Sequence, residues 1–448
     1  MIILEASIFH SVTLDQTKCK GCTNCLKRCP TEAIRVHDGK AQIIGAKCID
    51  CGECIRVCAY HAKVAVTDPL SILDKYKYKI ALPAPTLYGQ FKKLESIDAL
   101  LNGLLNIGFD DVYEVAKGAD IITKNVKEDT TIQKKRGPLI SSACPTIIRL
   151  IQVRFPELLE NIVNYISPME AAAKISKKEF AEKHNVDIKE IGAFFITPCP
   201  SKATAIKSPN GFDKSAVDGA ISILDIYGSL SAALNMEIDE LPKRASKHGV
   251  RWALSGGESD ALDNGNAISV DGINNVIEVL EAIEDGKLSN IDFFEGLACV
   301  GGCVGGALAF ENGFIARERI KKLSENLPDA VPYSKEEMAG FDFKLDYPIK
   351  PNEVLQLDKD FSIAIKKLEQ IEEITANLPG FDCGSCGAPS CRALAEDIVN
   401  KRAGEMDCVF KLREKVRVLA QEMIDFSYEA GLDSEKNDKS NNDEEVDG

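Results

Sequence analysis

The spacing of the cysteine residues constrains this chain more than any other feature of its sequence. Two runs, "CKGCTNCLKRCP" and "CIDCGECIRVCA", each hold four cysteines separated by two, two and three residues. The other eight of the 16 cysteines follow singly or in shorter clusters. Cysteines at such short, repeated spacings bind metals or clusters more often than they form disulfides when the compartment is reducing. The chain is therefore expected to fold around metal sites.

The composition limits which metal ligands and which binding partners are expected. Only five histidines are present, and only His61 lies near a cysteine cluster, so coordination by sulfur alone is expected. The net charge of -15 argues against nucleic acid or an anionic membrane as the main partner and suits a basic electron-transfer partner. The N-terminal "MIILEASIFHSV" has neither the basic segment nor the apolar run of a signal peptide, and no stretch is long enough to cross a membrane. A cytoplasmic protein is expected.

The first two runs resemble those of bacterial two-cluster ferredoxins. In that pattern three cysteines of each run bind one 4Fe-4S cluster and the fourth crosses to the other cluster. Ala59 replaces the proline that usually follows the second run. A pair of zinc sites is the alternative. The resemblance assigns one cluster to Cys19, Cys22, Cys25 and Cys58, and the other to Cys48, Cys51, Cys54 and Cys29.

A third cluster motif lies near the end of the chain. The segment "LPGFDCGSCGAPSC" is followed by one more cysteine in "GEMDC", and its glycines and Pro389 allow tight turns around a cluster. It resembles the small 4Fe-4S domain of electron-transport complexes and corrinoid iron-sulfur proteins, with a structural zinc as the alternative. Its ligands would be Cys383, Cys386, Cys391 and Cys408.

The rest of the chain suggests a large α/β domain between these modules. Buried-type strands such as "GAFFITP" alternate with helical stretches such as "KISKKEFAEKHNV". After it, apolar residues recur every three or four positions from Ile365 to Leu378, which predicts a helix that docks on its own domain or, less readily, forms a dimer. We expect a small α+β ferredoxin-like domain (1–75), an α/β domain (76–327), a linker (328–360), a helix with a small helical 4Fe-4S domain (361–430) and a disordered acidic tail (431–448).

Four cysteines remain, and all lie in the α/β domain. Cys144 and Cys199 each follow an apolar strand and precede a proline that can open a helix. Cys299 and Cys303 lie in "EGLACVGGCVGG". The carboxyl ends of strands, close to helix N-termini, are where an open α/β sheet forms its site and where thiolates are stabilised. The four residues are thus expected to form one metal site, with inert core thiols as the alternative.

Three segments of this domain resemble the H-domain of iron-only (FeFe) hydrogenases. They read "SSACP", "TPCPSK" and "EGLACVGGCVGG", in the family's order, where the family has TSCCP, MPCxxKK and ExMACxGGCxxGG. In that family these segments carry the H-cluster, a 4Fe-4S cubane joined through a cysteine sulfur to a two-iron unit with CO and CN ligands. The resemblance implies four 4Fe-4S clusters in all, one of them part of an H-cluster.

The resemblance also implies roles for individual residues. The cubane would be bound by Cys144, Cys199, Cys299 and Cys303, with Cys303 bridging to the two-iron unit. Lys202 would donate a hydrogen bond to a cyanide ligand. Backbone amides would approach the cluster at Gly301, Gly302, Gly305 and Gly306.

The sequence departs from catalytic hydrogenases along the proton path. Ala143 occupies the position of the cysteine that passes protons to the distal iron, and Ala205 replaces a glutamate of the same relay. Thr197 and Leu297 stand where the family has methionines. General acid-base transfer contributes about 10² to 10⁴ in rate. The pattern is similar to the divergent sensory type of FeFe hydrogenase and predicts slow, reversible hydrogen chemistry that reports to a redox or signalling protein.

Two other functions stay open at this point. A hydrogenase-like scaffold or electron carrier would keep the cubane and lack the two-iron unit, and the altered Ala143, Thr197 and Leu297 favour it. The retained Lys202 favours a hydrogenase. A plain multi-cluster ferredoxin is the third possibility, but the α/β domain is larger than cluster housing requires. A homodimer is also considered.

Overall fold

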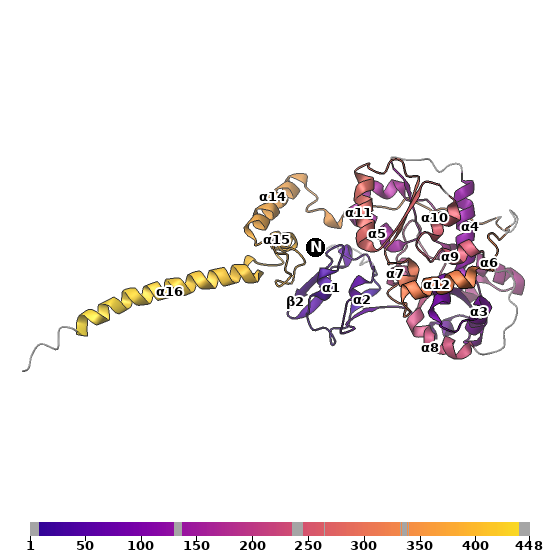
Figure 1. Cartoon of the computed structure of the whole chain (residues 1–448), viewed down its shortest axis with the longest axis horizontal. Coiled ribbons are helices and arrows are strands. Elements are labelled where there is room, and N and C mark those ends of the chain that lie inside the picture. The colour runs from indigo at the N-terminus through magenta and orange to yellow at the C-terminus, as the bar shows by residue number, and fades with distance from the viewer. Residues whose placement is uncertain are drawn as a thin grey trace, which may run out of the picture.

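The computed structural model of the protein describes residues 9–129, 137–234, 245–263, 265–331, 333, 338 and 340–438, with side chains described as far as residue 428. Figure 1 shows a small N-terminal module beside a large α/β domain, a helical C-terminal module next to the N-terminal one, and a long helix that extends away from both. This is the fold class that the sequence predicts. Within the described ranges, no helix is both long and apolar enough to cross a membrane.

The N-terminal module consists of two antiparallel strand pairs and two one-turn helices. A left-handed residue precedes each helix, Thr23 for α1 and Gly52 for α2, and each helix carries the third cysteine of its run. Its small buried core combines a few aliphatic side chains with several cysteines, so metal binding is expected to contribute to folding. The elements are β1 (Val12–Leu14) paired with β4 (Lys63–Ala65), β2 (Ile34–His37) paired with β3 (Lys40–Ile43), α1 (Asn24–Lys27) and α2 (Glu53–Arg56).

The α/β domain contains two parallel sheets. The larger sheet has the order β6-β5-β8-β9 and the smaller one the order β10-β11-β7. The strands are β5 (Tyr78–Pro83), β6 (Asp111–Val112), β7 (Leu139–Ile140), β8 (Ile191–Thr197), β9 (Gly219–Ser222), β10 (Ala267–Asp271) and β11 (Phe293–Leu297). The helices are α3 (Ile97–Asn106), α4 (Val115–Glu128), α5 (Pro145–Arg154), α6 (Pro168–His184), α7 (Pro200–Lys207), α8 (Ile223–Ala233), α9 (Lys247–Arg251), α10 (Gly257–Leu262), α11 (Ile273–Glu284) and α12 (Gly313–Ser324).

Burial of the strands explains why this domain holds its shape. All seven residues of β8 are buried, as expected for a central strand of a parallel sheet covered on both faces. Alternate residues of β8 enter opposite cores: Phe195 packs in one with α6, and Phe194 in the other with α3 and α8. A third core lies between α5 and α11 around Phe294 of β11. The carboxyl ends of β7, β8 and β11 are thereby fixed relative to one another.

The segment predicted to be a linker is packed against the α/β domain. Within it, Phe343 is buried and its carbonyl accepts a hydrogen bond from the Ile166 amide at 2.8 Å. The amide of Asn352 donates to the Gln152 carbonyl at 2.9 Å. Backbone pairing and one buried aromatic ring hold this segment in place, so it differs from a free linker.

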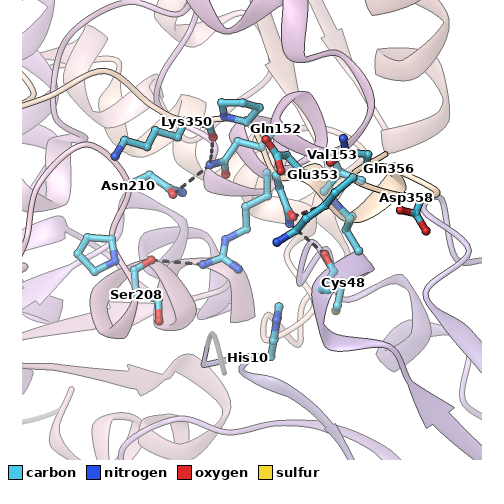
Figure 2. A pocket seen from close by; sticks show the side chains of 17 residues that line it. His10, Cys48, Gln152, Val153, Ser208, Asn210, Lys350, Glu353, Gln356 and Asp358 are labelled. Carbon is cyan, nitrogen blue, oxygen red and sulfur yellow. Dashed lines mark hydrogen bonds between the residues drawn. The ribbon is translucent and has the colours of Figure 1, made fainter. Parts of the chain in front are cut away.

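A large polar cavity lies where this segment meets the N-terminal module and α5. Its volume is about 760 Å³, and its walls include His10, Cys48, Arg149, Asn210 and Glu353 (Figure 2). Such junctions leave space because three separately folded surfaces rarely match everywhere. The cavity reaches Cys48, a cysteine of the second run.

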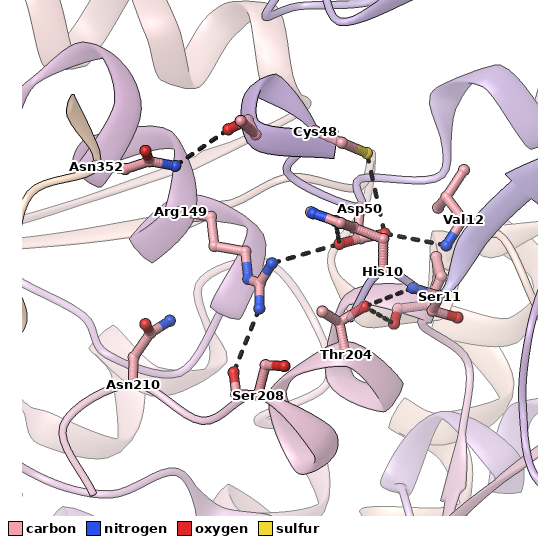
Figure 3. Close-up of polar contacts among 12 residues, drawn as sticks. His10, Ser11, Val12, Cys48, Asp50, Arg149, Thr204, Ser208, Asn210 and Asn352 are labelled. Atoms are coloured by element: carbon pink, nitrogen blue, oxygen red, sulfur yellow. Dashed lines mark hydrogen bonds and ion pairs between the residues drawn. The ribbon is translucent and has the colours of Figure 1, made fainter. Parts of the chain in front are cut away.

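Asp50 anchors the N-terminal module to the α/β domain beside this cavity. Its carboxylate is fully buried, accepts from the Val12 amide at 3.0 Å and pairs with His10 Nδ1 at 2.8 Å (Figure 3). A nitrogen of the Arg149 guanidinium lies 3.5 Å from the same carboxylate, and another donates to the Ser208 carbonyl at 3.3 Å. Charge-assisted contacts of this kind fix the orientation of the module on α5.

The C-terminal module docks on the N-terminal module. It consists of α14 (Phe361–Asn377), α15 (Cys391–Val399), the turn η8 (Glu405–Asp407) and α16 (Val409–Asp438). The Val36 amide donates to the Gly387 carbonyl at 2.9 Å, and Arg35 forms a buried ion pair with Asp397. The predicted helix over 361–378 is confirmed: its Ile371 is buried in its own module, whereas Ile365 is 41% exposed.

The end of the chain differs from the predicted disordered tail in one respect. The helical backbone of α16 continues to Asp438, so residues 431–438 are helical. This stretch contains the good helix formers Leu432, Glu435 and Lys436, which continue a helix already nucleated upstream. Residues 439–448 lie outside the described residues.

Replacing Arg35 with methionine is expected to loosen the C-terminal module. The side chains of Arg35 and Asp397 are only 5% and 7% exposed, so the variant leaves the Asp397 carboxylate buried without its cation. Breaking such a pair costs about 3–5 kcal/mol. Hydrogen exchange followed by mass spectrometry should show faster exchange across residues 378–408.

Two further variants serve as controls for this prediction. Lys47→Met removes the ion pair with Glu396, which is more exposed, and should change exchange little. Arg35→Met combined with Asp397→Leu removes both charges and should restore much of the protection. Unchanged exchange in Arg35→Met alone would show that the ion pair does not hold the module in place.

Candidate active site

Four cysteines of the α/β domain come together at the carboxyl ends of three strands, β7 and β11 of the smaller parallel sheet and β8 of the larger one. Cys144 follows β7, Cys199 follows β8, and Cys299 and Cys303 lie in the loop after β11. Cys144 and Cys199 are the N-caps of α5 and α7, and each helix begins at the following proline, as the sequence predicts. Proline at the first helical position fixes the chain direction there. The sheet topology thus gathers residues that are far apart in the sequence.

The four thiols form one electrostatic group. Burial raises the pKa of Cys199 well above its usual range, and the nearby charges of Cys299 and Cys144 add to the effect. Burial likewise raises the pKa of Cys303 to about 12, opposed by Lys202. Four mutually repelling thiolates need a compensating positive charge in a buried place. An iron-sulfur cluster supplies that charge, so the donor set fits the cubane that the sequence resemblance implies.

The glycine-rich loop after β11 packs tightly on neighbouring backbone. A Cβ atom at Gly302 would lie 2.6 Å from the Ser255 amide nitrogen, and one at Gly305 would lie 2.2 Å from the Val300 carbonyl oxygen. A Cβ atom at Gly306 would lie 2.4 Å from the Pro198 carbonyl oxygen. At Gly301 the constraint is the backbone itself, with φ at 80°. Close packing thus accounts for Gly302, Gly305 and Gly306, and backbone conformation for Gly301. That their amides approach a cluster stays a prediction.

A largely apolar cavity borders Cys303. Lys202 and Ala143 line it, and the Lys202 ammonium donates to the Ala143 carbonyl at 3.2 Å. Leu297 also lines it, and the remaining walls are mostly apolar. A mostly apolar space between a cysteine, a lysine and an alanine fits the two-iron unit that the resemblance implies, because the lysine offers a fixed cation to an anionic group there.

Thr197 and Ala205 are two further positions at which the sequence departs from catalytic hydrogenases, and the structure shows their contacts. The Thr197 hydroxyl exchanges hydrogen bonds with the backbone of Cys199, with the Cys199 amide donating to it at 3.0 Å. Ala205 lines a neighbouring cavity that Ala143 and Lys202 share. Both alanines thus line this cavity with methyl groups, which can neither donate nor accept a proton.

Two buried glutamates at the same cavity were missed by the sequence reasoning. Glu258 and Glu295 both line the cavity. Ser141 Oγ donates to the Glu258 carboxyl, and the Ala143 amide in turn donates to Ser141 Oγ at 3.1 Å. Glu295 is the first residue of the segment "EGLACVGGC", which carries two of the predicted ligands. No local motif distinguishes Glu258 in "GGESD" as a site residue.

The two carboxyl groups have different environments. Burial raises the pKa of Glu295, and hydrogen bonds from the amides of Gly256 (3.1 Å) and Ser259 (2.9 Å) oppose this shift. Burial raises the pKa of Glu258 to about 8, and the charge of Glu295 adds to the shift. At neutral pH the pair is therefore expected to retain a proton at the wall of the cavity, and the higher pKa favours Glu258 as the residue that carries it.

The cysteines of the N-terminal module form two groups that mix the two runs. Burial raises the pKa of Cys25, and Cys22, Cys58 and Cys19 add to the shift. Burial raises the pKa of Cys51, and Cys29, Cys54 and Cys48 add to that shift. The groups are those expected for crossed cluster ligation.

Backbone amides support both N-terminal groups. The Ala33 amide donates to Cys29 Sγ and the Ala62 amide to Cys58 Sγ, each at 3.2 Å. These paired contacts repeat the internal symmetry of the two runs. Hydrogen bonds to cluster sulfurs are among the features that tune reduction potentials.

In the C-terminal module three of the four cysteines share one small core. Cys386, Cys391 and Cys408 pack together beside Leu394. Burial raises the pKa of Cys386, and Cys383 and Cys408 add to the shift. Cys383 is exposed. Hydrogen bonds from Ser385 lower its pKa, and the nearby charge of Lys27 of the N-terminal module lowers it further.

Arg56 connects the N-terminal module to the central site. It lies on α2, between Cys54 and Cys58, and its guanidinium donates to Cys299 Sγ at 3.0 Å and to the Gly305 carbonyl. The loop before α2 packs closely, because a Cβ at Gly52 would lie 2.6 Å from the Ala307 side chain. The second cysteine run is thus in direct contact with the loop of the central site.

Replacing Arg56 with methionine is expected to lower the reduction potential of the cubane that the sequence resemblance implies at the central site. The wild-type guanidinium stabilises added negative charge on the sulfur of Cys299, and methionine offers neither charge nor hydrogen bond. A redox titration followed by electron paramagnetic resonance would measure the shift in the fully assembled protein. Arg28→Met removes an exposed arginine of the first run and should leave this potential unchanged. Equal reduction potentials in the wild type and Arg56→Met would show that the Arg56 guanidinium does not influence the central site.

Comparison with known proteins identifies the family of the α/β domain. The family model "Iron only hydrogenase large subunit, C-terminal domain" matches residues 77–264 and 258–307, slightly more than half of the 448 residues. A 4Fe-4S dicluster domain matches residues 11–59, and an Fe-S cluster domain matches residues 378–410.

Individual relatives are distant. Iron hydrogenase 1 of Clostridium pasteurianum is 24% identical over 369 residues, which cover 66% of this chain and 64% of that protein. A probable cytosolic Fe-S cluster assembly factor of Drosophila erecta is 22% identical over 330 residues, covering 60% of this chain and 66% of that protein. A solved FeFe-hydrogenase variant from Chlamydomonas reinhardtii has a TM-score of 0.44 at 16% identity and covers 60% of this chain and 89% of its own.

The chain thus spans slightly less than two thirds of the length of these two curated relatives. Its three cysteine-bearing parts each match a family of iron-sulfur domains, and the largest match contains all four cysteines of the central site. By that match, which covers more than half of its length, the chain belongs to the iron-only hydrogenase family.

Proposed function

We propose that the protein is a slow FeFe hydrogenase that senses hydrogen or redox state. It would oxidise hydrogen and reduce protons reversibly and pass electrons along its iron-sulfur clusters. The observation that carries this proposal is the cavity beside Cys303, where Lys202 and the protonated Glu258 face the same space. A bare cubane has no evident need for either residue.

The proposed ligands follow the cysteine groups. The central cubane would be held by Cys144, Cys199, Cys299 and Cys303, and the two-iron unit by Cys303 with a hydrogen bond from Lys202. When bound, that unit supplies the site at which hydrogen is split or formed. The other twelve cysteines would hold three further 4Fe-4S clusters, giving four in all.

Residues of the chain would manage protons and electrons separately. Oxidation of one hydrogen molecule yields two protons and two electrons. Glu258 holds a proton at its carboxyl at neutral pH and can exchange it with the cavity, with Ser141 hydrogen-bonded to it. The Arg56 contact favours electron exchange between the central cubane and the N-terminal module, and the docked C-terminal module extends that route. Ala143 keeps proton transfer slow.

Where the protein works and what it reports to are further parts of the proposal. Sixteen free cysteines grouped as ligand sets favour a reducing, cytoplasmic setting. A basic redox protein or a signalling protein would suit the acidic chain, with net charge -15. Neither nucleic acid nor a membrane is proposed as a partner.

A second candidate function is an iron-sulfur scaffold or electron carrier without the two-iron unit. Ala143, Thr197 and Leu297 all depart from catalytic hydrogenases, and the assembly factor of Drosophila erecta is similar over 60% of this chain. This function would need the cubanes and their contacts but no hydrogen chemistry at Cys303.

Infrared spectroscopy distinguishes the two functions. The protein would be purified without oxygen after expression with hydrogenase maturation enzymes or loading with a synthetic two-iron complex. CO and CN bands that shift under hydrogen are expected, and Lys202→Met should shift or remove them. Full iron content in all four cubanes without such bands would favour the scaffold. Cys383→Ser in the C-terminal module should leave the bands unchanged.

A further inference from the structure

Helix α16 leaves the body of the protein. Figure 1 shows it extending well beyond the other elements. Its base packs on the turn η8, and the ring of Phe410 lies 5.1 Å from that of Phe381. Along its described length beyond that base, most side chains are exposed. A solitary helix in water is only marginally stable, because most helix stability in proteins comes from packing of an apolar face.

The exposed side of α16 carries an unbroken heptad seam. Apolar residues recur at alternating intervals of three and four positions, which is the spacing of coiled-coil core positions a and d. Between 40% and 74% of the surface of each is exposed. The seam residues are Val409, Leu412, Val416, Leu419, Met423 and Phe426.

Exposed apolar surface of this kind normally marks an interaction site. The seam is regular and extends over three a/d pairs, which fits another helix better than a globular surface. Valine at both early a positions and leucine at both early d positions is the combination that favours two strands over three or four. A second copy of the chain offers a seam of the same length and composition.

We propose that α16 pairs with α16 of a second copy to form a two-stranded antiparallel coiled coil. The distribution of charge along the helix determines the antiparallel direction. Residues 411–417 contain Lys411, Arg413, Lys415 and Arg417 against one acid, whereas residues 418–428 contain Glu422 and Asp425 and no base. A parallel pair would bring the two basic halves together. An antiparallel pair sets each basic half against the acidic half of the other copy.

The heptad register identifies the residues that meet. With Val416 packed against Leu419 of the second copy, the flanking g positions bring Lys415 next to Glu422 of the second copy, twice by symmetry. In a parallel pair Lys415 would face Ala420 and Glu422 would face Ser427, so neither charge would find a counter-charge. Lys415 and Glu422 therefore report the direction of pairing.

Light scattering coupled to size-exclusion chromatography on the full-length protein tests the pairing. A dimer is expected, with a monomer fraction that grows on dilution. Leu419→Asp places a charge in the seam and should give a monomer. Val418→Asp makes the same change at a neighbouring, 42% exposed position off the seam and should leave the dimer intact. A monomeric wild type, a larger oligomer or a dimer that survives Leu419→Asp would overturn the proposal.

A charge swap tests the direction of pairing. Lys415→Glu alone and Glu422→Lys alone should each weaken the dimer, because like charges would then face each other. The double variant Lys415→Glu with Glu422→Lys should restore the affinity of the wild type. Dimers that are indifferent to both single changes would rule out the antiparallel arrangement, since a parallel pair leaves these two residues without charged neighbours.

Discussion

Hydrogen turnover should rise by about 10²- to 10⁴-fold when Ala143 is replaced by cysteine, the range that general acid-base transfer contributes. Ala143 lines the cavity beside Cys303, and its amide donates to Ser141 Oγ, which is hydrogen-bonded to Glu258. A thiol at this position would face the cavity next to an existing network of protonatable groups. The methyl group of alanine can neither accept nor donate a proton.

The measurement is hydrogen evolution with a reduced viologen, divided by the amount of assembled site from infrared spectroscopy. Ala119→Cys is the matched control, because Ala119 lines the same cavity from α4 but has no link to Ser141 or Glu258. Ala143→Cys combined with Ala205→Glu should exceed the single variant, since it restores both missing relay groups. If Ala143→Cys has the turnover of the wild type, proton delivery at this position is not what limits the rate.

Replacing Glu258 with glutamine should lower hydrogen turnover by about 10² or more in the wild-type background. Glutamine keeps the size of the side chain and can still accept the hydrogen bond from Ser141, but it cannot take up or release a proton. The infrared bands of the assembled site should stay in place, which separates proton transfer from loss of the cofactor. Glu114→Gln is the matched control, because Glu114 is also buried and its pKa is also raised by burial, but it lies outside this cavity. Equal losses in the two variants would assign the effect to burial in general.

The same glutamate gives a pH dependence with a definite sign. Burial raises the pKa of Glu258 from 4.5 to about 8, so between these values the folded protein holds a proton that the unfolded chain has released. The free energy of unfolding should therefore fall as pH rises through this window, and Glu258→Gln should flatten that slope. Proton reduction by the wild type should also decline as pH passes 8, because Glu258 is then no longer protonated. Thermal unfolding and turnover measured on both sides of pH 8 test both statements.

The cysteine motifs were readable from the sequence because their ligands are close along the chain. Runs such as that from Cys19 to Cys29 place several thiols within a few residues, and tight turns bring such neighbours together whatever the rest of the fold does. The large domain was also predictable, since β8 reads as a continuous apolar strand and proves to be fully buried. The helix over 361–378 followed from its apolar periodicity in the same way.

Contacts between distant residues could not be predicted. Ser141 and Glu258 are 117 positions apart, and Arg56 and Cys299 are 243 apart. Nothing near Glu258 marks it as a buried group beside a site. The helix over 361–378 was the predicted candidate for a dimer contact, but its Ile371 is buried in its own module, whereas the seam of α16 is exposed.

The sequence by itself therefore determined the iron-sulfur character of the cysteine motifs, their order along the chain and the α/β class of the domain between them. Only the tertiary structure decided that Glu258 borders the same cavity as Cys303, that Arg56 joins two modules, and that the segment after residue 340 is packed. The physical reason is the distance along the chain over which each signal acts. Cysteine spacing, proline and apolar periodicity act over a few residues, whereas burial, which raises the pKa of Glu258, arises only when strands and helices from the whole chain have packed together.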